Sequence, residues 1–199
     1  MLYLVSMTKR ILGIDCSSTT IGWCVLDIDS KITFVKAGYI KPIKSGSIIS
    51  RIVDTRNKIQ TLINLYKPDH IGIEDIIQFM KGKSTAQTII MLTTFNRMVG
   101  LCAFDYLMSS PEFFNVMAIR HGLKIGKDLP KKEDMPELVA KHLEITFPYE
   151  YSSRGKKLGS IKIENYDMAD GIAVALYYAF VLTGKTKQRK KTTSKKKAK

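Results

Sequence analysis

Short apolar runs with strand character dominate the first third of the chain. Residues 10–15 and 21–27 are rich in isoleucine, valine, leucine and tryptophan, and the polar sequence CSSTT lies between them. Two such runs joined by a short polar segment predict a β-hairpin. Residues 31–40 predict a third strand, and the sequence HIGIED at residues 70–75 predicts a short buried strand further along. We therefore expect a sheet that begins with three antiparallel strands.

Apolar residues at helical spacing predict most of the helices. Residues 47–66 repeat apolar positions three and four apart, as a helix that is buried on one face does. Residues 135–145 predict another helix, and residues 165–182 predict a last one that Gly184 closes. Residues 113–119 predict a further strand. This order of elements predicts an α/β fold, in which helices flank both faces of a mixed β-sheet.

The helix predicted over residues 85–108 differs from the others because it is apolar nearly all round. A helix of this kind needs cover on more than one side. The sheet can cover one side, and a second copy of the chain can cover the other. We therefore expect this helix to form a homodimer interface, with a central core helix as the alternative.

Positive charge is concentrated at the end of the chain. The 199 residues carry a formal net charge of +14, and residues 185–199 hold nine of the 32 lysines and arginines and no acidic residue. The rest of the chain is only mildly basic, with 23 basic and 18 acidic side chains. A tail of this composition cannot bury apolar surface and is expected to be disordered. It is either an arm that binds nucleic-acid phosphates or a solubilising or localising tail.

Cysteine usage and hydropathy bear on the compartment. Cys16, Cys24 and Cys102 match no zinc-binding or disulfide framework, which favours a reducing compartment. The apolar stretch over residues 171–182 is too short to cross a bilayer. The opening sequence MLYLVSM lacks the basic start of a secretory signal. We therefore expect a cytoplasmic protein without a membrane partner.

Four acidic residues occupy positions where a folded protein seldom places charge. Asp15 and Glu74 end two buried strands, and Asp167 and Asp170 lie one helical turn apart at the start of the last helix. Each has a structural alternative: a turn, an ion pair with a lysine, or a helix cap. Grouped carboxylates repel one another and lose hydration, which costs several kcal/mol unless cations compensate. The set therefore predicts a site for Mg²⁺, which prefers oxygen ligands, and two such ions about 4 Å apart can drive phosphodiester hydrolysis.

The order of these acids resembles a known family. An Asp ends the first strand in ILGIDCSSTTIGW, a Glu ends a later strand in HIGIED, and YDMADGIAVAL is similar to the D-x-x-D-A helix that closes the site. This is the pattern of the RuvC-type Holliday junction resolvases, within the ribonuclease H-like superfamily. The resemblance extends from about Lys9 to Leu182. It implies a ribonuclease H-like mixed sheet, with three antiparallel strands followed by parallel ones.

The resemblance also implies an activity. Members are homodimers that cut four-way DNA junctions by paired, symmetric nicks, using two Mg²⁺ or Mn²⁺ ions in each active site. By motif position, Asp15, Glu74, Asp167 and Asp170 would be the catalytic metal ligands, and Asp15 would bridge both ions. The expected domain order is a flexible start at residues 1–8, the nuclease domain at residues 9–184 and the basic tail.

Basic residues between the predicted strand at 113–119 and the next helix correspond to a basic segment of the family. We expect DNA contacts from residues in three loops, namely Phe79, Lys81 and Lys83; Arg120, Lys124, Lys127, Lys131 and Lys132; and Arg154, Lys156 and Lys157. Arg120 and Lys132 match the family's positions best. Solvated loop charge is the alternative for the lysines and arginines, and a core position is the alternative for Phe79.

The chain departs from the bacterial pattern at two places. Bacterial members usually have Pro-Gly after the first Asp, where this chain has Cys16 and Ser17. Some place an aromatic wedge three residues after the strand Glu, where this chain has Ile77, and Phe79 could take over that role. These departures, with the basic tail, indicate a divergent member. Our hypothesis is a viral member in which junction sequence preference or branch specificity has changed.

Three other functions remain open at this point. The opening sequence GIDCSSTTIGWCVLD also resembles the first phosphate motif of sugar kinases and actin-like ATPases, which share the same core fold. Those proteins need a second half-domain and a glycine-rich adenosine site, and this chain has no Gly-Gly pair. A nuclease of the same superfamily that cuts flaps, forks or RNA–DNA hybrids would have the same acids. A module that binds junctions without cutting would usually have lost one of them.

Overall fold

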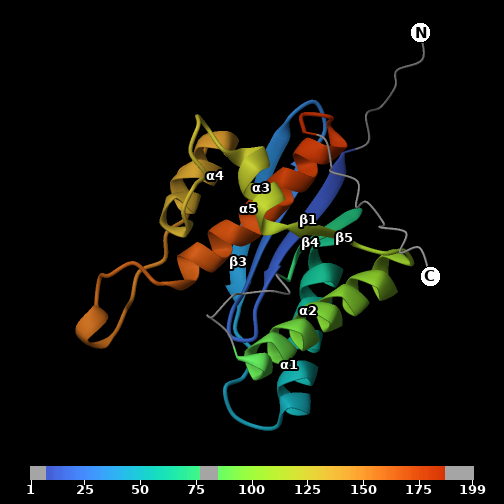
Figure 1. Cartoon of the computed structure of the whole chain (residues 1–199), viewed down its shortest axis with the longest axis vertical. Coiled ribbons are helices and arrows are strands. Elements are labelled where there is room, and N and C mark those ends of the chain that lie inside the picture. Colours follow the sequence, from blue (N-terminus) through green and yellow to red (C-terminus); the bar gives the residue numbers. More distant parts are fainter. Residues whose placement is uncertain (1–7, 77–84, 187–199) are drawn as a thin grey trace, which may run out of the picture.

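A twisted five-stranded sheet forms the centre of the computed structural model, which describes residues 8–76 and 85–186 (Figure 1). The strand order is β3-β2-β1-β4-β5. In chain order the strands are β1 (Lys9–Cys16), β2 (Ile21–Ile28), β3 (Ile32–Ile40), β4 (His70–Asp75) and β5 (Glu112–Asn115). The first three pair antiparallel, and β4 and β5 run parallel to β1. The mixed sheet of a ribonuclease H-like fold is therefore confirmed.

Helices cover both faces of this sheet, as predicted. On one face lie α1 (Ile48–Tyr66) and α2 (Ala86–Leu107), and on the other lie α3 (Val116–Leu123), α4 (Met135–Leu143) and α5 (Glu164–Leu182) (Figure 1). The alternation of side chains along a strand divides the core into two layers. In β1, Ile11 belongs to the α5 layer, and Leu12 and Ile14 belong to the layer under α1 and α2.

The helix boundaries follow from local capping. The hydroxyl of Ser47 accepts a hydrogen bond from the backbone N–H of Ser50 and so caps α1, and Thr85 caps α2 in the same way through Thr88. At the C-terminal end of α5, Gly184 adopts a left-handed conformation just beyond the helix. Within residues 8–76 and 85–186, no helix is both long and apolar enough to span a membrane.

The strand predicted over residues 113–119 is wrong in its second half. Strand β5 ends at Asn115, and α3 begins at Val116. The side-chain oxygen of Asn115 accepts a hydrogen bond from the backbone N–H of Met117 at 2.8 Å, which caps the new helix. Ile119 and Leu123 are buried one helical turn apart, so the apolar run combines the end of a strand with the buried face of a helix.

Helix α5 lies against the sheet at backbone contact distance. A Cβ atom added to Gly22 would lie 1.7 Å from the carbonyl oxygen of Asp167, and one added to Gly13 would lie 2.3 Å from the backbone nitrogen of Ala175. Gly171 of α5 faces the sheet in the same way, with an added Cβ 2.5 Å from the backbone nitrogen of Trp23. These glycines therefore set how closely the helix approaches β1 and β2.

The Gly22→Ala substitution tests this contact. We expect the added methyl group to push the start of α5 away from the sheet and to lower the free energy of unfolding by about 3 kcal/mol, since overpacked cores lose stability. Urea unfolding measures the change. Gly38→Ala is the matched control, because a Cβ there meets the ring of Trp23, a side chain that can move, rather than backbone. Equal stability of the two variants would contradict the contact.

Candidate active site

Three chain segments meet at one edge of the sheet and bring the acidic residues together. Strands β1 and β4 are parallel neighbours, with Ile14 opposite Ile73, so the residues that follow, Asp15 and Glu74, emerge at the same edge. Residue Asp15 is also paired with Gly22 of β2, and Gly22 is the residue that contacts the backbone of Asp167. The pairing of the strands and the close approach of α5 together determine this meeting point.

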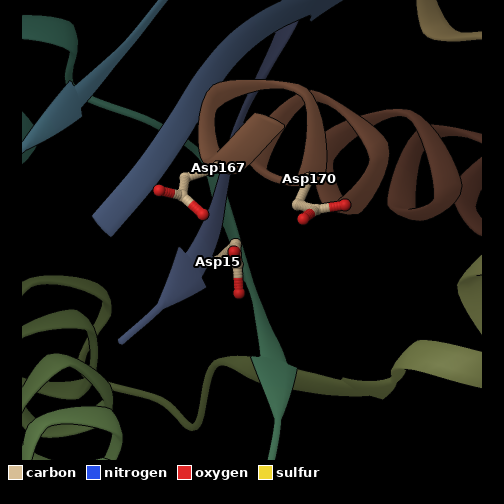
Figure 2. A group of neighbouring side chains, drawn as sticks. All are labelled: Asp15, Asp167 and Asp170. Atoms are coloured by element: carbon tan, nitrogen blue, oxygen red, sulfur yellow. The ribbon is translucent and has the colours of Figure 1, made fainter. Parts of the chain in front are cut away.

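The carboxylates of Asp15, Asp167 and Asp170 converge on a common point (Figure 2). One oxygen from each side chain lies within 4.8 Å of the other two. Asp167 and Asp170 are on the same face of α5, as their spacing predicts, and Asp15 lies below them in the view, near the end of β1 (Figure 2). These three residues could share a metal ion.

Glu74 lies beside this cluster and lines the same open cavity. The cavity has a volume of about 260 Å³, and its wall includes Asp15, Glu74 and Asp170 together with Ser17, Leu92, Arg120 and Lys132. The pKa of Glu74 is raised by burial and then by the negative charge of Asp170, so these two carboxylates are close to each other. All four predicted acids are thus at one edge of the sheet.

Burial and mutual repulsion make these carboxyl groups hard to ionise. Burial is the main cause that raises the pKa of Asp15 well above its ordinary value, and the charges of Glu74 and Asp170 add to it. Burial likewise raises the pKa of Glu74 to about 7 and that of Asp170 to about 6. Without added positive charge, the site therefore holds protons near neutral pH.

Two of the predicted basic residues, Lys132 and Arg120, face these acids. The Nζ atom of Lys132 lies 3.0 Å from Oδ1 of Asp167 and 3.6 Å from Oδ2 of Asp170. The charge of Arg120, at the cavity wall, lowers the pKa of Glu74 and Asp170 and so opposes the effect of burial. Its Nε atom is buried and has no hydrogen-bond partner among the described residues. Both cations are placed where an anionic phosphate could bind.

The other predicted contact residues lie away from the cavity wall or cannot be placed. Lys124, Lys127 and Lys131 are exposed, and the ammonium of Lys124 donates to the carbonyl oxygen of Lys127 at 3.2 Å. Arg154 and Lys157 are exposed at the short 3₁₀ helix Gly155–Lys157, which also contains Lys156. The predicted contacts Phe79, Lys81 and Lys83, like Ile77, lie outside the described residues.

Asn96 of α2 supports the site and was not anticipated from the sequence. Its side chain is buried, and Nδ2 donates a hydrogen bond to the carbonyl oxygen of Glu74 at 2.8 Å. The neighbouring Arg97 forms an ion pair with Asp75 at 3.2 Å. Helix α2 therefore holds the end of β4 through two consecutive residues. The sequence signal for this role was a polar amide within an apolar helix. The signal could not identify the partner, because Glu74 is 22 residues away in the chain.

Arg51 of α1 supports the turn that follows Asp15. Its guanidinium donates to the carbonyl oxygen of Ser18 at 2.6 Å and to that of Ile43 at 3.0 Å. Within the turn, the hydroxyl of Ser17 accepts from the backbone N–H of Thr20 at 3.0 Å and donates to its carbonyl oxygen at 2.6 Å. The CSSTT segment is thus a hydrogen-bonded turn beside the acids, and the predicted β-hairpin is confirmed.

Comparison with known proteins assigns the chain to a family. The family described as Crossover junction endodeoxyribonuclease RuvC matches residues 11–152. The RuvC protein of Endomicrobium trichonymphae is 34% identical over 148 residues, covering 65% of this chain and 76% of the relative. That of Helicobacter pylori strain G27 is 26% identical over 171 residues, covering 85% and 96%. The match to the RuvC protein of Orientia tsutsugamushi strain Boryong, 32% identical, spans only 40% of this chain and 50% of the relative.

Solved structures share the fold. The structure described as Thermus thermophilus RuvC in complex with Holliday junction substrate has a TM-score of 0.65 and 16% identity, covering 88% of this chain and 96% of that one. The yeast mitochondrial Holliday junction resolvase Ydc2 has a TM-score of 0.58 and 16% identity, covering 88% and 80%. The family match favours a nuclease over the sugar-kinase alternative. The chain belongs to the crossover junction endodeoxyribonuclease RuvC family.

Proposed function

We propose that this protein resolves four-way DNA junctions by metal-dependent hydrolysis of phosphodiester bonds. The observation that carries the proposal is the convergence of Asp15, Asp167 and Asp170 at one open edge of the sheet, with Glu74, Lys132 and Arg120 beside them. Carboxylates that face an open cavity next to cations suit a substrate that brings phosphate groups and a metal that prefers oxygen ligands.

The four acids are proposed to hold two divalent cations, Mg²⁺ or Mn²⁺. Besides burial, the charges of Glu74, Asp170 and Asp167 raise the pKa of Asp15, so the four carboxylates are near one another and would together hold the ions. Burial of the carboxyl groups disfavours their ionised forms, and divalent cations would reverse that preference. When bound, such ions activate water and stabilise the leaving oxygen of the phosphodiester.

Lys132 and Arg120 are proposed to bind and orient the scissile phosphate. The ammonium of Lys132 contacts Asp167 and Asp170, and a metal ion at these carboxylates would compete with it. Once displaced, the ammonium would be free to pair with a phosphate oxygen nearby. Arg120 offers a buried N–H group that has no hydrogen-bond partner in the described part of the chain. Unused donors at a cavity wall favour an anionic ligand.

Paired, symmetric nicks require two active sites related by a two-fold axis, and α2 offers a surface for that assembly. One stripe of this helix and its C-terminal cap carries exposed apolar residues one to three turns apart, namely Ile90, Leu101, Phe104 and Met108. Exposed apolar patches of this kind mark interaction sites. We infer that a second copy of the chain covers this stripe, so that the protein acts as a homodimer.

Two other activities remain alternatives to this proposal. A broader nuclease that cuts flaps or forks would use the same acids, and the shape of the dimer would decide its substrate. A module that binds junctions without cutting would not need four convergent carboxylates, whose mutual repulsion costs stability. The presence of all four therefore favours cutting.

Cleavage of end-labelled DNA tests the proposal. The substrates are a four-way junction, a three-way junction, a flap, a linear duplex and an RNA–DNA hybrid, each with Mg²⁺, Mn²⁺ or EDTA. We expect metal-dependent symmetric nicks mainly in the four-way junction. Asp15→Asn and Asp170→Asn should lower the cleavage rate at least a hundredfold and still bind the junction, because they remove metal ligands and leave the surface intact.

Each other outcome has a definite meaning. Equal cutting of flaps and forks would identify a general branch nuclease. Tight binding of the junction without cutting by the unaltered protein would identify a binding module. Full activity of Asp15→Asn would refute the metal-site assignment.

The metal-free protein is expected to lose stability as the pH rises. The pKa values of Glu74 and Asp170, about 7 and about 6 when folded, exceed the ordinary values of 4.5 and 3.8. Between about pH 4 and pH 7 the folded state therefore binds more protons than the unfolded chain. At about 1.4 kcal/mol for each pKa unit, these two groups would lower the free energy of unfolding across this window by up to about 6 kcal/mol. Urea unfolding in EDTA at several pH values measures it.

Variants and metal give the controls for this pH dependence. Glu74→Gln should flatten the fall in stability, because its side chain does not ionise. Addition of Mg²⁺ should raise the melting temperature more at pH 8 than at pH 5, because the cation competes with protons for the carboxylates. A stability that rises across the same window in EDTA would contradict the electrostatic description of the site.

Substitution of the apolar stripe tests the dimer. Leu101→Asp combined with Phe104→Asp places charge on the exposed face of α2 and should yield monomers in analytical ultracentrifugation, without a large change in circular dichroism. Leu65→Asp, at an exposed apolar position of α1, is the matched control. A double variant that sediments like the unaltered protein would mean that the stripe is not the interface.

A further inference from the structure

A basic finger projects from the body of the protein next to the start of α5. We use the term finger for residues 150–162, the orange loop at the lower left of Figure 1. Its two sides pair as a short antiparallel ladder, with a bridge between Tyr151 and Ile161 and a hydrogen bond from the Ser152 N–H to the carbonyl oxygen of Ser160 at 2.8 Å. The loop therefore has a defined conformation.

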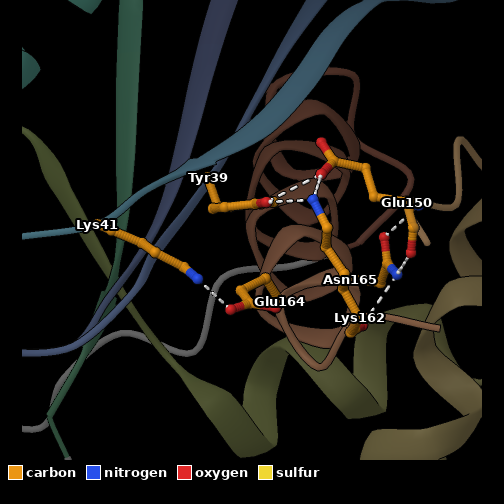
Figure 3. A network of polar contacts seen from close by, with 6 residues as sticks. All are labelled: Tyr39, Lys41, Glu150, Lys162, Glu164 and Asn165. Atoms are coloured by element: carbon orange, nitrogen blue, oxygen red, sulfur yellow. Dashed lines mark hydrogen bonds and ion pairs between the residues drawn. The ribbon is translucent and has the colours of Figure 1, made fainter. Parts of the chain in front are cut away.

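The root of the finger is fastened by Asn165, the second residue of α5. This side chain is fully buried, and Nδ2 donates to the carbonyl oxygens of Glu150 at 2.8 Å and Lys162 at 2.9 Å (Figure 3). Its Oδ1 accepts the backbone N–H of Glu150 at 2.9 Å. One buried amide thus holds both ends of the finger, two residues before Asp167.

A charged network secures the same root to the edge strand β3. The ammonium of Lys162 lies 2.7 Å from Oε2 of Glu150, and the hydroxyl of Tyr39 donates to that oxygen at 2.9 Å (Figure 3). Lys41 of the chain segment after β3 pairs with Glu164 at the start of α5. The root is therefore held by the same helix that positions Asp167 and Asp170.

The tip of the finger is cationic and extends into open space. Arg154 and Lys157 are exposed, Lys156 lies between them in the sequence, and residues 151–161 include no acidic residue. Gly155 and Gly159 have left-handed φ angles of 68° and 77°, and a Cβ added to either would meet no atom within 4 Å. The exposed side chains of Arg154 and Lys157 are therefore available to an anionic partner.

We propose that the finger binds the phosphate backbone of the duplex arm that flanks the cleavage point. This inference rests on the proposed function. The tip is four to five residues from the root, and an extended chain rises about 3.3 Å per residue, so the finger reaches at most about 15 Å. Duplex DNA rises about 3.4 Å per base pair. The contact would therefore lie roughly four to five base pairs from the scissile phosphate.

The experiment compares Arg154→Gln/Lys156→Gln/Lys157→Gln with a matched triple variant. The control is Lys9→Gln/Lys31→Gln/Lys67→Gln, three exposed lysines at the opposite end of the sheet. Binding of a four-way junction is measured against salt concentration in the Asp170→Asn background, which prevents cutting. We expect the slope of log affinity against log salt to become shallower by about 2 to 3 in the finger variant, since each lost phosphate contact contributes about 0.9. The control should keep its slope.

The position of the contact is tested on the DNA. Junctions with uncharged methylphosphonates four to five base pairs from the cleavage point should bind the unaltered finger more weakly, and the finger variant should be insensitive to them. A second variant replaces residues 153–159 by Asn-Gly, a two-residue turn that suits the hydrogen-bonded Ser152 and Ser160. It should show the same loss of salt dependence as the triple variant.

Different outcomes separate this inference from the proposed function. If the finger variants bind with an unchanged salt slope while the unaltered protein cuts the junction, the finger inference is wrong and the function stands. If cleavage at saturating DNA falls more than tenfold in a folded finger variant, the finger acts in the cleavage step and the binding role is wrong. If the unaltered protein binds no branched DNA, both proposals fail.

Discussion

The contact between the backbones of α5 and β2 is the constraint on which the site depends. Gly22 is at once the partner of Asp15 in the sheet and the point where the carbonyl oxygen of Asp167 touches β2. A side chain at this position would separate the helix from the strands by the thickness of a methyl group or more. Because Gly22 of β2 and Gly171 of α5 have no side chains, the two backbones approach closely, and carboxylates from β1 and α5 come within 4.8 Å of one another.

The grouping of carboxylates that forms the site also lowers the stability of the fold. The carboxyl groups of Asp15, Glu74 and Asp170 are half-buried near one another, and their loss of hydration raises the pKa of each. Asn96 is a second polar group that is buried at a cost, since its Oδ1 atom has no hydrogen-bond partner among the described residues. Both features cost folding free energy. Deviations of this kind gather at functional sites, where position matters more than local stability.

The supporting contacts come from side chains outside the acidic cluster. Arg51 fixes the turn after Asp15, Asn96 fixes the end of β4, and Asn165 fixes the loop before α5. Each of these side chains bonds to backbone atoms of a segment that borders an acidic residue. The acids are therefore held from three directions by residues that do not belong to the acidic cluster themselves.

Much of the architecture was determined by local sequence. Alternating apolar residues around Asp15 and Glu74 predict buried strands, and the spacing of Asp167 and Asp170 predicts a shared helical face, because these patterns depend only on the geometry of one element. The strand predicted over residues 113–119 was wrong, since the apolar pattern cannot show where Asn115 caps a helix. Local pattern thus predicts elements better than their ends.

The tertiary structure alone decided which polar residues meet. Lys131 and Lys132 are adjacent in the sequence. Lys132 lies within ion-pair distance of Asp167 and Asp170, whereas Lys131 is exposed, because the segment packs against α5 with Lys132 toward the acids. Asn96 and Asn165 find partners 22 and 15 residues away, which no local pattern reveals. The sequence by itself determined the elements and the candidate acids. The packing of α5 on the glycines of the sheet decided their common meeting point, because that distance depends on contacts between segments remote in the chain.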